Sequence, residues 1–244
     1  MRVFTNERKI KRNRRLATAA FVVALAVLIG SMVIFWTVPP EAQFDLFWLS
    51  TAMLAVGMVA AVTAVRLTND WVRRPRPEEA LNESLKGLGN NYSLYHFWMP
   101  ARHVLVSPQG ILCLTVRVQP GRFAVRGDRW RTQANPVARL GRLFRQEQIG
   151  NPTLDAQRDA ARVQVWLDRI IPDSGVEVEP VVVFISPAAT FEAEDPTVPV
   201  LYADSEREPN LRGYVTALGR DRERARVTRE HRRALEAAVL GSAE

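Results

Sequence analysis

Two long stretches without a charged residue constrain the fold of this chain more than any other feature. Leu16–Val38 contains 23 residues and Leu46–Val65 contains 20, and neither includes an Asp, Glu, Lys or Arg. At a rise of about 1.5 Å per residue, each stretch in helical form can cross a hydrocarbon core about 30 Å thick. We therefore predict transmembrane helices at residues 16–38 and 46–65, joined by a short turn at residues 39–43, and the lipid bilayer is the first predicted partner.

A cleaved signal peptide is the alternative interpretation of the first apolar stretch. The stretch is longer than the apolar region of a typical signal peptide, and no clear small-x-small cleavage motif ends it. A second apolar stretch also follows within a few residues. A two-helix membrane hairpin accounts for all three observations.

Positive charge flanks both outer ends of this hairpin. Residues 1–15 carry seven Lys and Arg against Glu7 alone, and four arginines follow the second stretch between Arg66 and Arg76. The intervening loop holds only Glu41 and the nearby Asp45. The positive-inside rule then predicts an inner (plasma) membrane protein with two spans and with both termini in the cytoplasm.

The net charge of +7 belongs entirely to this membrane region. Residues 1–77 carry 11 basic and 4 acidic side chains, whereas residues 78–244 carry 22 of each. Basicity of the whole chain is therefore no argument for nucleic-acid binding.

Small residues recur at helical spacing within both apolar stretches. Ala26 and Gly30 lie four apart in the first, and Gly57, Ala61 and Ala64 follow one side of the second. Such residues let helices approach closely. They serve either packing inside the hairpin or homo-oligomer formation through the transmembrane faces.

Beyond the hairpin, the sequence predicts a basic juxtamembrane linker at residues 66–77, an α/β domain at 78–219 and a charged C-terminal helix at 220–244. The α/β domain is expected to contain a mixed sheet flanked by helices. Expected helices cover residues 78–88, 136–148, 153–171, 210–219 and 221–240, with Ala160, Val163, Val165, Trp166 and Ile170 in the core. Expected strands cover residues 92–98, 103–107, 111–118, 123–126, 130–132, 178–186 and 198–202.

The most informative part of this domain is a predicted β-hairpin. Strands at His103–Ser107 and Ile111–Val118 are separated by Ser107-Pro108-Gln109-Gly110, with proline and glycine placed for a type I turn. This hairpin resembles the core of the NERD (nuclease-related domain) family of the PD-(D/E)xK nuclease superfamily. In that family an Ile-Asp-His strand leads to Pro-x-Gly and to a strand ending in Glu-x-Lys, and His103, Pro108 and Gly110 match the pattern.

The resemblance implies a restriction-endonuclease-like fold with altered chemistry. The family's aspartate, glutamate and lysine correspond here to Arg102, Thr115 and Arg117. Carboxylates at those places hold Mg²⁺, which needs oxygen ligands. No Asp or Glu occurs between Glu83 and Asp128, so no shift of the hairpin restores a carboxylate pair. No metal and no cofactor is expected, and the candidates for leftover active-site acids are Glu79 and Glu83.

One local cluster of positive charge remains. Nine arginines and a single acid, Asp128, occur between Arg102 and Arg145. Arginine suits phosphate because its guanidinium donates two parallel hydrogen bonds. The opposing interpretation is that these arginines are dispersed and pair with the acidic segment at 192–208. The predicted nucleic-acid or anion contacts are Arg102, Arg117, Arg122, Arg126 and Arg131.

Three functions follow as hypotheses. The first is a membrane-anchored, catalytically inactive nuclease fold that acts as a binding or scaffold module, possible partners being nucleic acid and an unidentified protein. The second is an active nuclease that uses Mg²⁺ and relocated acids such as Glu79, Glu83 or Asp128. The third is a protein–protein assembly module without nucleic-acid affinity. The sequence has no phosphate-binding loop, no Gly-x-Ser-x-Gly motif and no zinc-ligand spacing around its three histidines.

Overall fold

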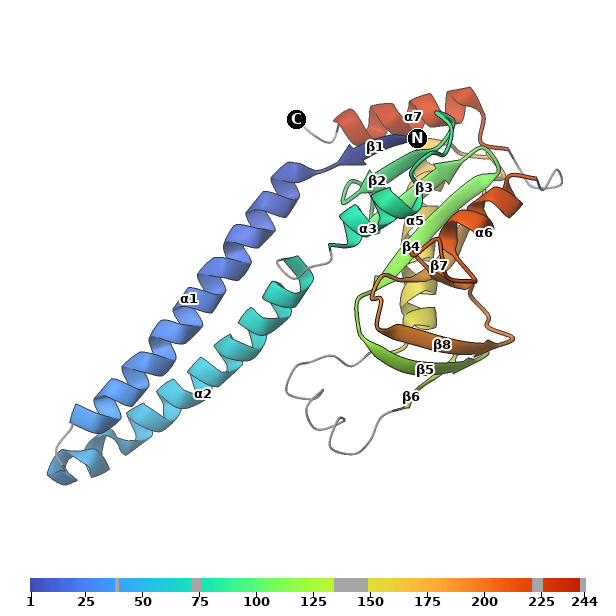
Figure 1. Cartoon of the computed structure of the whole chain (residues 1–244). Helices are drawn as coiled ribbons and strands as arrows, with labels where there is room; N and C mark the ends of the chain where they lie inside the picture. The colour runs from blue at the N-terminus through green and yellow to red at the C-terminus, as the bar shows by residue number, and fades with distance from the viewer. Residues whose placement is uncertain (38–39, 72–75, 134–148, 221–225, 242–244) are drawn as a thin grey trace. The chain divides into compact units, whose positions relative to one another are not determined.

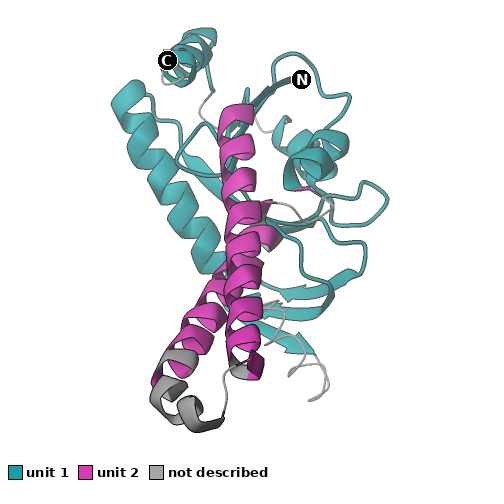
Figure 2. Ribbon diagram, turned by 90° about the vertical axis from the view of Figure 1, so that its left-hand side faces the viewer, with its two compact units in different colours: residues 1–6, 77–244 teal, residues 7–76 magenta. Residues whose placement is uncertain are grey.

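A computed structural model describes residues 1–37, 40–71, 76–133, 149–220 and 226–241 of the chain. The chain forms two compact units. One unit combines Met1–Asn6 with Pro77–Glu244, and the other is Glu7–Arg76 (Figure 2). Each unit is described by itself below.

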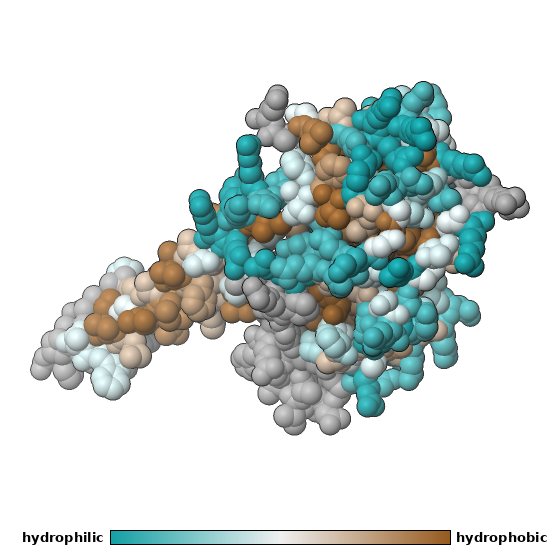
Figure 3. Space-filling view, turned by 45° about the horizontal axis from the view of Figure 1, so that its top comes forward, coloured by the Kyte–Doolittle hydropathy of each residue, from teal (hydrophilic) through white to brown (hydrophobic). Residues whose placement is uncertain are grey.

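The second unit is a pair of long helices, α1 (Glu7–Thr37) and α2 (Pro40–Trp71), packed against each other. Both helices are long and apolar enough to cross a membrane. Figure 3 shows brown, apolar side chains along this pair, in contrast to the hydrophilic surface shown for much of the other unit. The predicted turn at 39–43 is wrong at residues 40–43, because α2 already begins at Pro40. Proline is accepted at the first helical position, where its missing N–H has no partner to lose. The predicted linker at 66–77 is also shorter, since α2 continues to Trp71.

Small residues do pack inside this helix pair, but the sequence assigned only some of them. Ala17, Ala24 and Ser31 of α1 are buried at seven-residue intervals, and Ala64 of α2 is buried. A Cβ atom on Gly57 would lie 2.9 Å from Leu28 Cδ2, so this glycine is part of the close contact. A Cβ on Gly30 would meet nothing within 4 Å, and Ala26 is exposed.

The first unit contains a six-stranded mixed sheet, in the order β1-β2-β3-β4-β7-β9 (Figure 1). Its strands are β1 (Arg2–Thr5), β2 (Ser93–His96), β3 (His103–Ser107), β4 (Gly110–Arg117), β7 (Val178–Phe184) and β9 (Val200–Tyr202). The predicted hairpin is confirmed as β3 and β4, which pair from Ser107↔Gly110 to Val104↔Cys113. The hydroxyl of Ser107 closes the turn by donating to Gly110 O and accepting from Gln109 N–H.

Helices cover both faces of this sheet. On one face, leucines of α3 (Pro77–Ser84) and α6 (Leu211–Leu218) pack on Leu112 and Leu114 of β4. On the other face, α5 (Pro152–Ile170) and α7 (Arg229–Gly241) pack on Ile111 and Cys113. Because successive strand residues point to opposite faces, β4 contributes alternately to two separate cores. An α/β fold with a mixed sheet between helices, as expected from the sequence, is therefore observed.

Proline 180 shows how β7 fits between its neighbours. It lies inside a strand that pairs with β4 along its whole length but with β9 only from Val182 to Phe184. Val182 N–H donates to Pro199 O on the β9 side, so the missing N–H of Pro180 falls on the same side, where no strand is paired. The proline therefore removes no sheet hydrogen bond.

A second, three-stranded sheet has the order β6-β5-β8. Its strands are β5 (Gly121–Arg126), β6 (Arg129–Gln133) and β8 (Ala189–Glu194). The hairpin of β5 and β6 was predicted, whereas β8 was not. Phe123, Trp130 and Phe191 pack around Phe184 on the inner side of this sheet.

The chain begins with a strand that the sequence did not predict. Residues 2–5, assigned to a basic cytoplasmic segment, form β1, which pairs in parallel with β2 from Arg2↔Ser93 to Thr5↔His96. The Met1 ammonium donates to Leu88 O at 2.6 Å, and Arg2 pairs with Glu236 of α7. The chain ahead of α1 is thus an edge strand of the sheet formed by the chain behind α2.

Other boundaries differ from expectation. The first domain helix ends at Ser84 instead of Leu88, and β2 ends at His96 because Phe97 adopts a positive φ of 64°. Helix α7 begins at Arg229, since 226–228 are not helical, and Val165 is 54% exposed instead of being in the core. The helix expected at 136–148 lies outside the described residues.

Replacing Phe4 by alanine is expected to destabilise the α/β unit by about 1–2 kcal/mol, because Phe4 is half-buried and stacks on Tyr95 with 4.9 Å between ring centroids. The matched control is Val3→Ala, since Val3 is 42% exposed, and its effect is expected to stay within about 0.5 kcal/mol. Urea unfolding of the full chain in detergent, followed by tryptophan fluorescence, measures both. Equal effects would contradict the assignment of β1.

Candidate functional site

Thr115 and Arg117, the positions compared above with the Glu-x-Lys pattern of NERD domains, lie on the α5 side of β4. Thr115 and Arg117 follow Cys113 by two and four residues, so they point to the same face of the sheet as Cys113, which packs on α5. Leu114 points to the opposite face, into the other core. Thr115 is 6% exposed, and its hydroxyl makes no hydrogen bond among the described residues. The strand thus directs the two side chains toward the first turns of α5.

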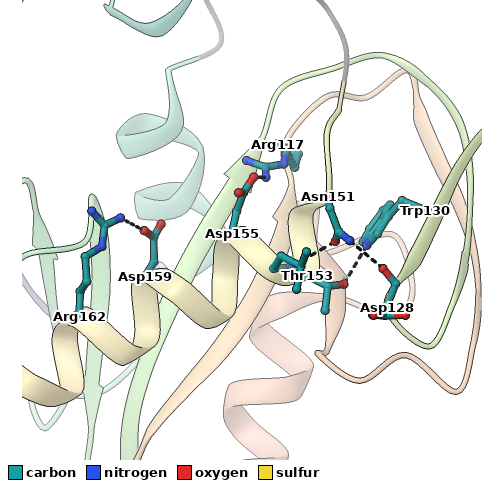
Figure 4. A network of polar contacts seen from close by, with 9 residues as sticks. Arg117, Asp128, Trp130, Asn151, Thr153, Asp155, Asp159 and Arg162 are labelled. Carbon is teal, nitrogen blue, oxygen red and sulfur yellow. Dashed lines mark hydrogen bonds and ion pairs between the residues drawn. The ribbon is translucent and has the colours of Figure 1, made fainter.

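Arg117 is held there by an ion pair. Its guanidinium donates to Asp155 Oδ2 at 2.5 Å, and its side chain is 15% exposed (Figure 4). Burial lowers the pKa of the Arg117 guanidinium, and the adjacent Asp155 carboxylate opposes this shift. Arginine keeps its charge under such conditions, so this is a fixed cation neutralised by a fixed anion.

A second carboxylate, Asp159, lies one helical turn further along α5. It is paired with Arg162 of the same helix, as Figure 4 shows. Asp155 and Asp159 are therefore each bound to a guanidinium group. In the described part of the chain, no three His, Cys, Asp or Glu side chains lie close enough together to hold a metal ion.

The start of α5 is fixed by contacts with the three-stranded sheet. The Asn151 side chain accepts a hydrogen bond from Leu154 N–H, as an N-cap does, and its amide donates to Asp128 O at 3.1 Å. The Trp130 indole donates to Thr153 Oγ1 at 2.8 Å. These contacts, drawn in Figure 4, connect the β5–β6 hairpin to the helix that carries Asp155.

The predicted leftover acids lie elsewhere. Glu79 and Glu83 belong to α3, which packs on the opposite face of the sheet from Thr115 and Arg117. Glu83 is exposed and pairs with Lys86 at 3.3 Å. Lys86 is also the single lysine in residues 77–244, and it is the exposed partner of Glu83. The side-chain role of Asp128 as an acid stays a prediction.

The five predicted anion contacts do not form one cluster. Arg117 is half-buried beside α5, Arg102 precedes β3, and Arg126 pairs with Glu194 at 2.7 Å. Arg122 and Arg131 lie on the outward face of the three-stranded sheet, and Arg129, which the sequence analysis did not name, lies there too. Pairing with the acidic segment at 192–208 is observed for Arg126 and not for these three within the described residues.

A buried histidine pair lies on the α3 side of the sheet. His96 Nε2 is 3.1 Å from Asn82 Oδ1, which can only accept, so this nitrogen donates. His96 Nδ1 then accepts from His103 Nδ1–H at 2.8 Å. Burial lowers the pKa of His96 to about 4 and lowers the pKa of His103 well below its usual value, where Arg102 acts in the same direction. His103, which matches the family pattern, is thus part of a neutral structural pair.

Cys113 lies in the middle of β4 and is fully buried. Burial raises the pKa of its thiol to about 12. A thiol with that pKa is protonated at neutral pH, which fits the expected structural role.

Two residues of this region were missed by sequence reasoning. Asp155 and Asp159 are four apart on α5, each directly before the buried Ala156 and Ala160. Both aspartates therefore border the apolar stripe of α5 that faces the core. This position in the helical pattern was the sequence signal that could have identified them. The partner of Asp155 could not be assigned from spacing, because Arg117 is distant in sequence and lies on another element. The partner of Asp159 could have been, because Arg162 follows it by three residues on the same helix.

Comparison with known proteins adds no assignment. No protein-family model matches the chain, and neither a curated protein nor a solved structure matches it.

Replacing Asp155 by asparagine is expected to destabilise the unit by about 1–3 kcal/mol, because it leaves the buried Arg117 guanidinium without its counter-charge. Adding Arg117→Met should restore most of that loss. The control Asp159→Asn removes the partner of Arg162, whose side chain is 64% exposed and can be hydrated instead, and should cost less than about 1 kcal/mol. Urea midpoints of the four chains test this, and no recovery in the double variant would argue against a structural ion pair.

Acid is expected to weaken the fold through the histidine pair. The pKa of His96 is about 4 in the folded chain against 6.5 as its usual value, so the unfolded chain binds more protons between these values. The contribution of His96 to the free energy of unfolding is therefore complete above pH 6.5. It decreases by about 3 kcal/mol as the pH drops toward 4. A chain with His96→Leu and His103→Leu should have a flatter dependence of the urea midpoint between pH 7 and 5; an unchanged slope would contradict this origin.

Proposed function

We propose that this chain is a membrane-anchored binding module whose α/β unit binds nucleic acid through its phosphate backbone without cutting it. The single observation that carries the proposal is a group of arginines on the outward face of the three-stranded sheet that have no partner among the described residues. The membrane anchor and the absence of nuclease chemistry are separate parts of the same proposal.

The anchor is the pair α1 and α2, placed in the inner membrane with both termini in the cytoplasm. Positive charge at both outer ends supports this topology. The pairing of β1 with β2 supports it independently, because Met1–Asn6 and the chain after Arg76 belong to one compact unit. Two segments of one sheet must lie on the same side of a bilayer, which requires an even number of crossings between them.

The non-catalytic role rests on the α5 side of β4. We interpret the mixed sheet and its helices as a restriction-endonuclease-like fold similar to NERD domains. The place of the catalytic carboxylate is then taken by Thr115, and the place of the lysine by Arg117, whose charge is neutralised by Asp155. An arginine locked in an ion pair supports structure, and a buried hydroxyl supplies no anionic oxygen for Mg²⁺.

The binding surface is formed by β5 and β6. Arg122 is opposite Gln133, Ala124 is opposite Arg131, and Arg126 is opposite Arg129, so these side chains share one face. All but the half-buried Ala124 are exposed on that face, and Arg122, Arg129 and Arg131 have no partner among the described residues. Residues two apart on a strand are about 6.7 Å apart, so Arg129 and Arg131 on β6 can contact separate phosphates of one backbone. The acidic Glu192 and Glu194 lie on β8, so the positive charge is concentrated toward the β6 edge.

The experiment is fluorescence anisotropy with labelled duplex and single-stranded DNA, using the full chain in nanodiscs of zwitterionic lipid. Binding in the range of about 1–100 μM that weakens steeply between 50 and 200 mM salt is expected for backbone contacts. Arg122→Gln, Arg129→Gln and Arg131→Gln together should reduce affinity at least tenfold and reduce the salt slope by about 2–3.

The matched control replaces three exposed arginines elsewhere, Arg158, Arg169 and Arg233, by glutamine, which changes the net charge equally. This control should retain at least half of the affinity. Equal losses in both triple variants would mean that only overall charge acts. Absence of binding at low salt would favour the protein-assembly hypothesis instead.

A second candidate function is an active nuclease that uses the carboxylates of α5. It is favoured by one observation, the adjacency of Asp155 and Asp159 beside β4. Incubation of the chain with plasmid and Mg²⁺ or Mn²⁺ separates the two candidates. Cleavage that is abolished by Asp155→Asn, or by Glu79→Ala or Glu83→Ala, would overturn the non-catalytic proposal.

A further inference from the structure

Helix α1 has an unusual start. It begins at Glu7 and continues without a break from a basic segment into the apolar stretch. Its first nine residues include Arg8, Lys9, Lys11, Arg12, Arg14 and Arg15. Within the described residues, the partner found for Lys11 is Glu7 at 2.9 Å, whereas Arg12, Arg14 and Arg15 have no partner.

This arrangement is unfavourable for an isolated helix. The N-terminus of a helix carries a partial positive charge, so cations in its first turns are repelled. Arg12 and Arg15 are three apart, and Lys11 and Arg15 are four apart, so like charges are also direct neighbours on the helix surface. A layer of anionic groups around these turns attracts the cations and offsets both their repulsion by the helix N-terminus and their repulsion of one another.

The cations border a groove that continues onto apolar side chains. The groove has a volume of about 490 Å³ and is lined by Arg8, Lys11, Arg12, Arg15, Leu16 and Ala19. An adjoining groove of about 520 Å³ includes Arg14 and Thr18. All of these side chains are exposed, and the residues that pack on α2 are on the other side of the helix, where Ala17 and Ala24 are buried.

The position of the groove along the helix matches a lipid headgroup. Lys11 to Arg15 lie within five residues of Leu16, which is about 7 Å at the rise of an α-helix. The headgroup region on each side of a bilayer is about 5–7 Å thick. Directly below, Phe21, Val22 and Val23 are between 50% and 58% exposed, as side chains that face acyl chains are.

We infer that the lipid-facing side of α1 binds acidic phospholipids, with Lys11, Arg12, Arg14 and Arg15 contacting the headgroup phosphate and with the acyl chain along Leu16 and Ala19. The inference rests on the membrane anchor proposed above, and is independent of nucleic-acid binding. The ligand must combine an anionic phosphate with an apolar chain, because the groove offers cations at one end and apolar surface at the other.

The test compares the full chain in nanodiscs of phosphatidylcholine with discs that contain 20% phosphatidylglycerol. Native mass spectrometry counts retained lipids, and hydrogen exchange measures protection of residues 7–15. Phosphatidylglycerol should be enriched on the chain and should slow exchange in this segment. Arg12→Gln, Arg14→Gln and Arg15→Gln together should reduce the enrichment by about fivefold per arginine. Glutamine keeps helix propensity, so loss of the helix does not confound the variant.

The control is again Arg158→Gln, Arg169→Gln and Arg233→Gln, which should retain the enrichment. Equal enrichment in the α1 variant, or equal protection in both kinds of disc, would overturn the inference while leaving the anchor intact. Protection by 50 mM inorganic phosphate in phosphatidylcholine discs would also overturn it, since the site would then bind the free anion. Release of the chain from membranes by alkaline carbonate would overturn the anchor itself.

Discussion

The pairing of the first five residues with β2 is the interaction on which the rest of the architecture depends. Two long helices separate β1 from the remainder of its sheet, yet Arg2 N–H donates to Tyr92 O and Asn6 N–H donates to His96 O. The α/β unit is therefore discontinuous in sequence, and the helix pair is an insertion between its first strand and its first helix. If the two helices cross a membrane, as we propose, an even number of crossings returns the chain to the side on which β1 lies.

The sheet itself separates two kinds of polar contact. On the α3 side, two neutral histidines and Asn82 form a hydrogen-bonded chain. On the α5 side, Arg117 and Asp155 form an ion pair. Each pair is buried or half-buried, and removing its polar groups from water costs free energy. The hydrogen bond or ion pair between the partners offsets that cost. Arg122, Arg129 and Arg131 have no such partner within the described residues, and this difference in pairing is why we propose binding at the three-stranded sheet and a structural role at β4.

Local elements could be predicted from the sequence, and long-range pairing could not. The helix of α5, the β3–β4 hairpin and the helix pair each carry a periodic pattern or a turn motif within a few residues. β1 is four residues long, and its partner lies about 90 residues away, so nothing in Arg2–Thr5 identifies it as a strand. β8 was missed for the same reason. The neighbours of Arg129 and Asp155 depend on the register of the sheets, which the sequence alone does not show. The resemblance to NERD domains directed attention to Thr115 and Arg117, but the partner of Arg117 came from the structure alone.

Hydrogen exchange of the peptide Met1–Asn6 in the full membrane-embedded chain tests the central pairing most directly. The account predicts that the amides of Arg2 and Asn6 exchange as slowly as those of β2, because both donate to carbonyl oxygens of the neighbouring segment. Exchange at the rate of an unstructured segment would contradict it, and with it the argument that both ends of the helix pair lie on one side of the membrane.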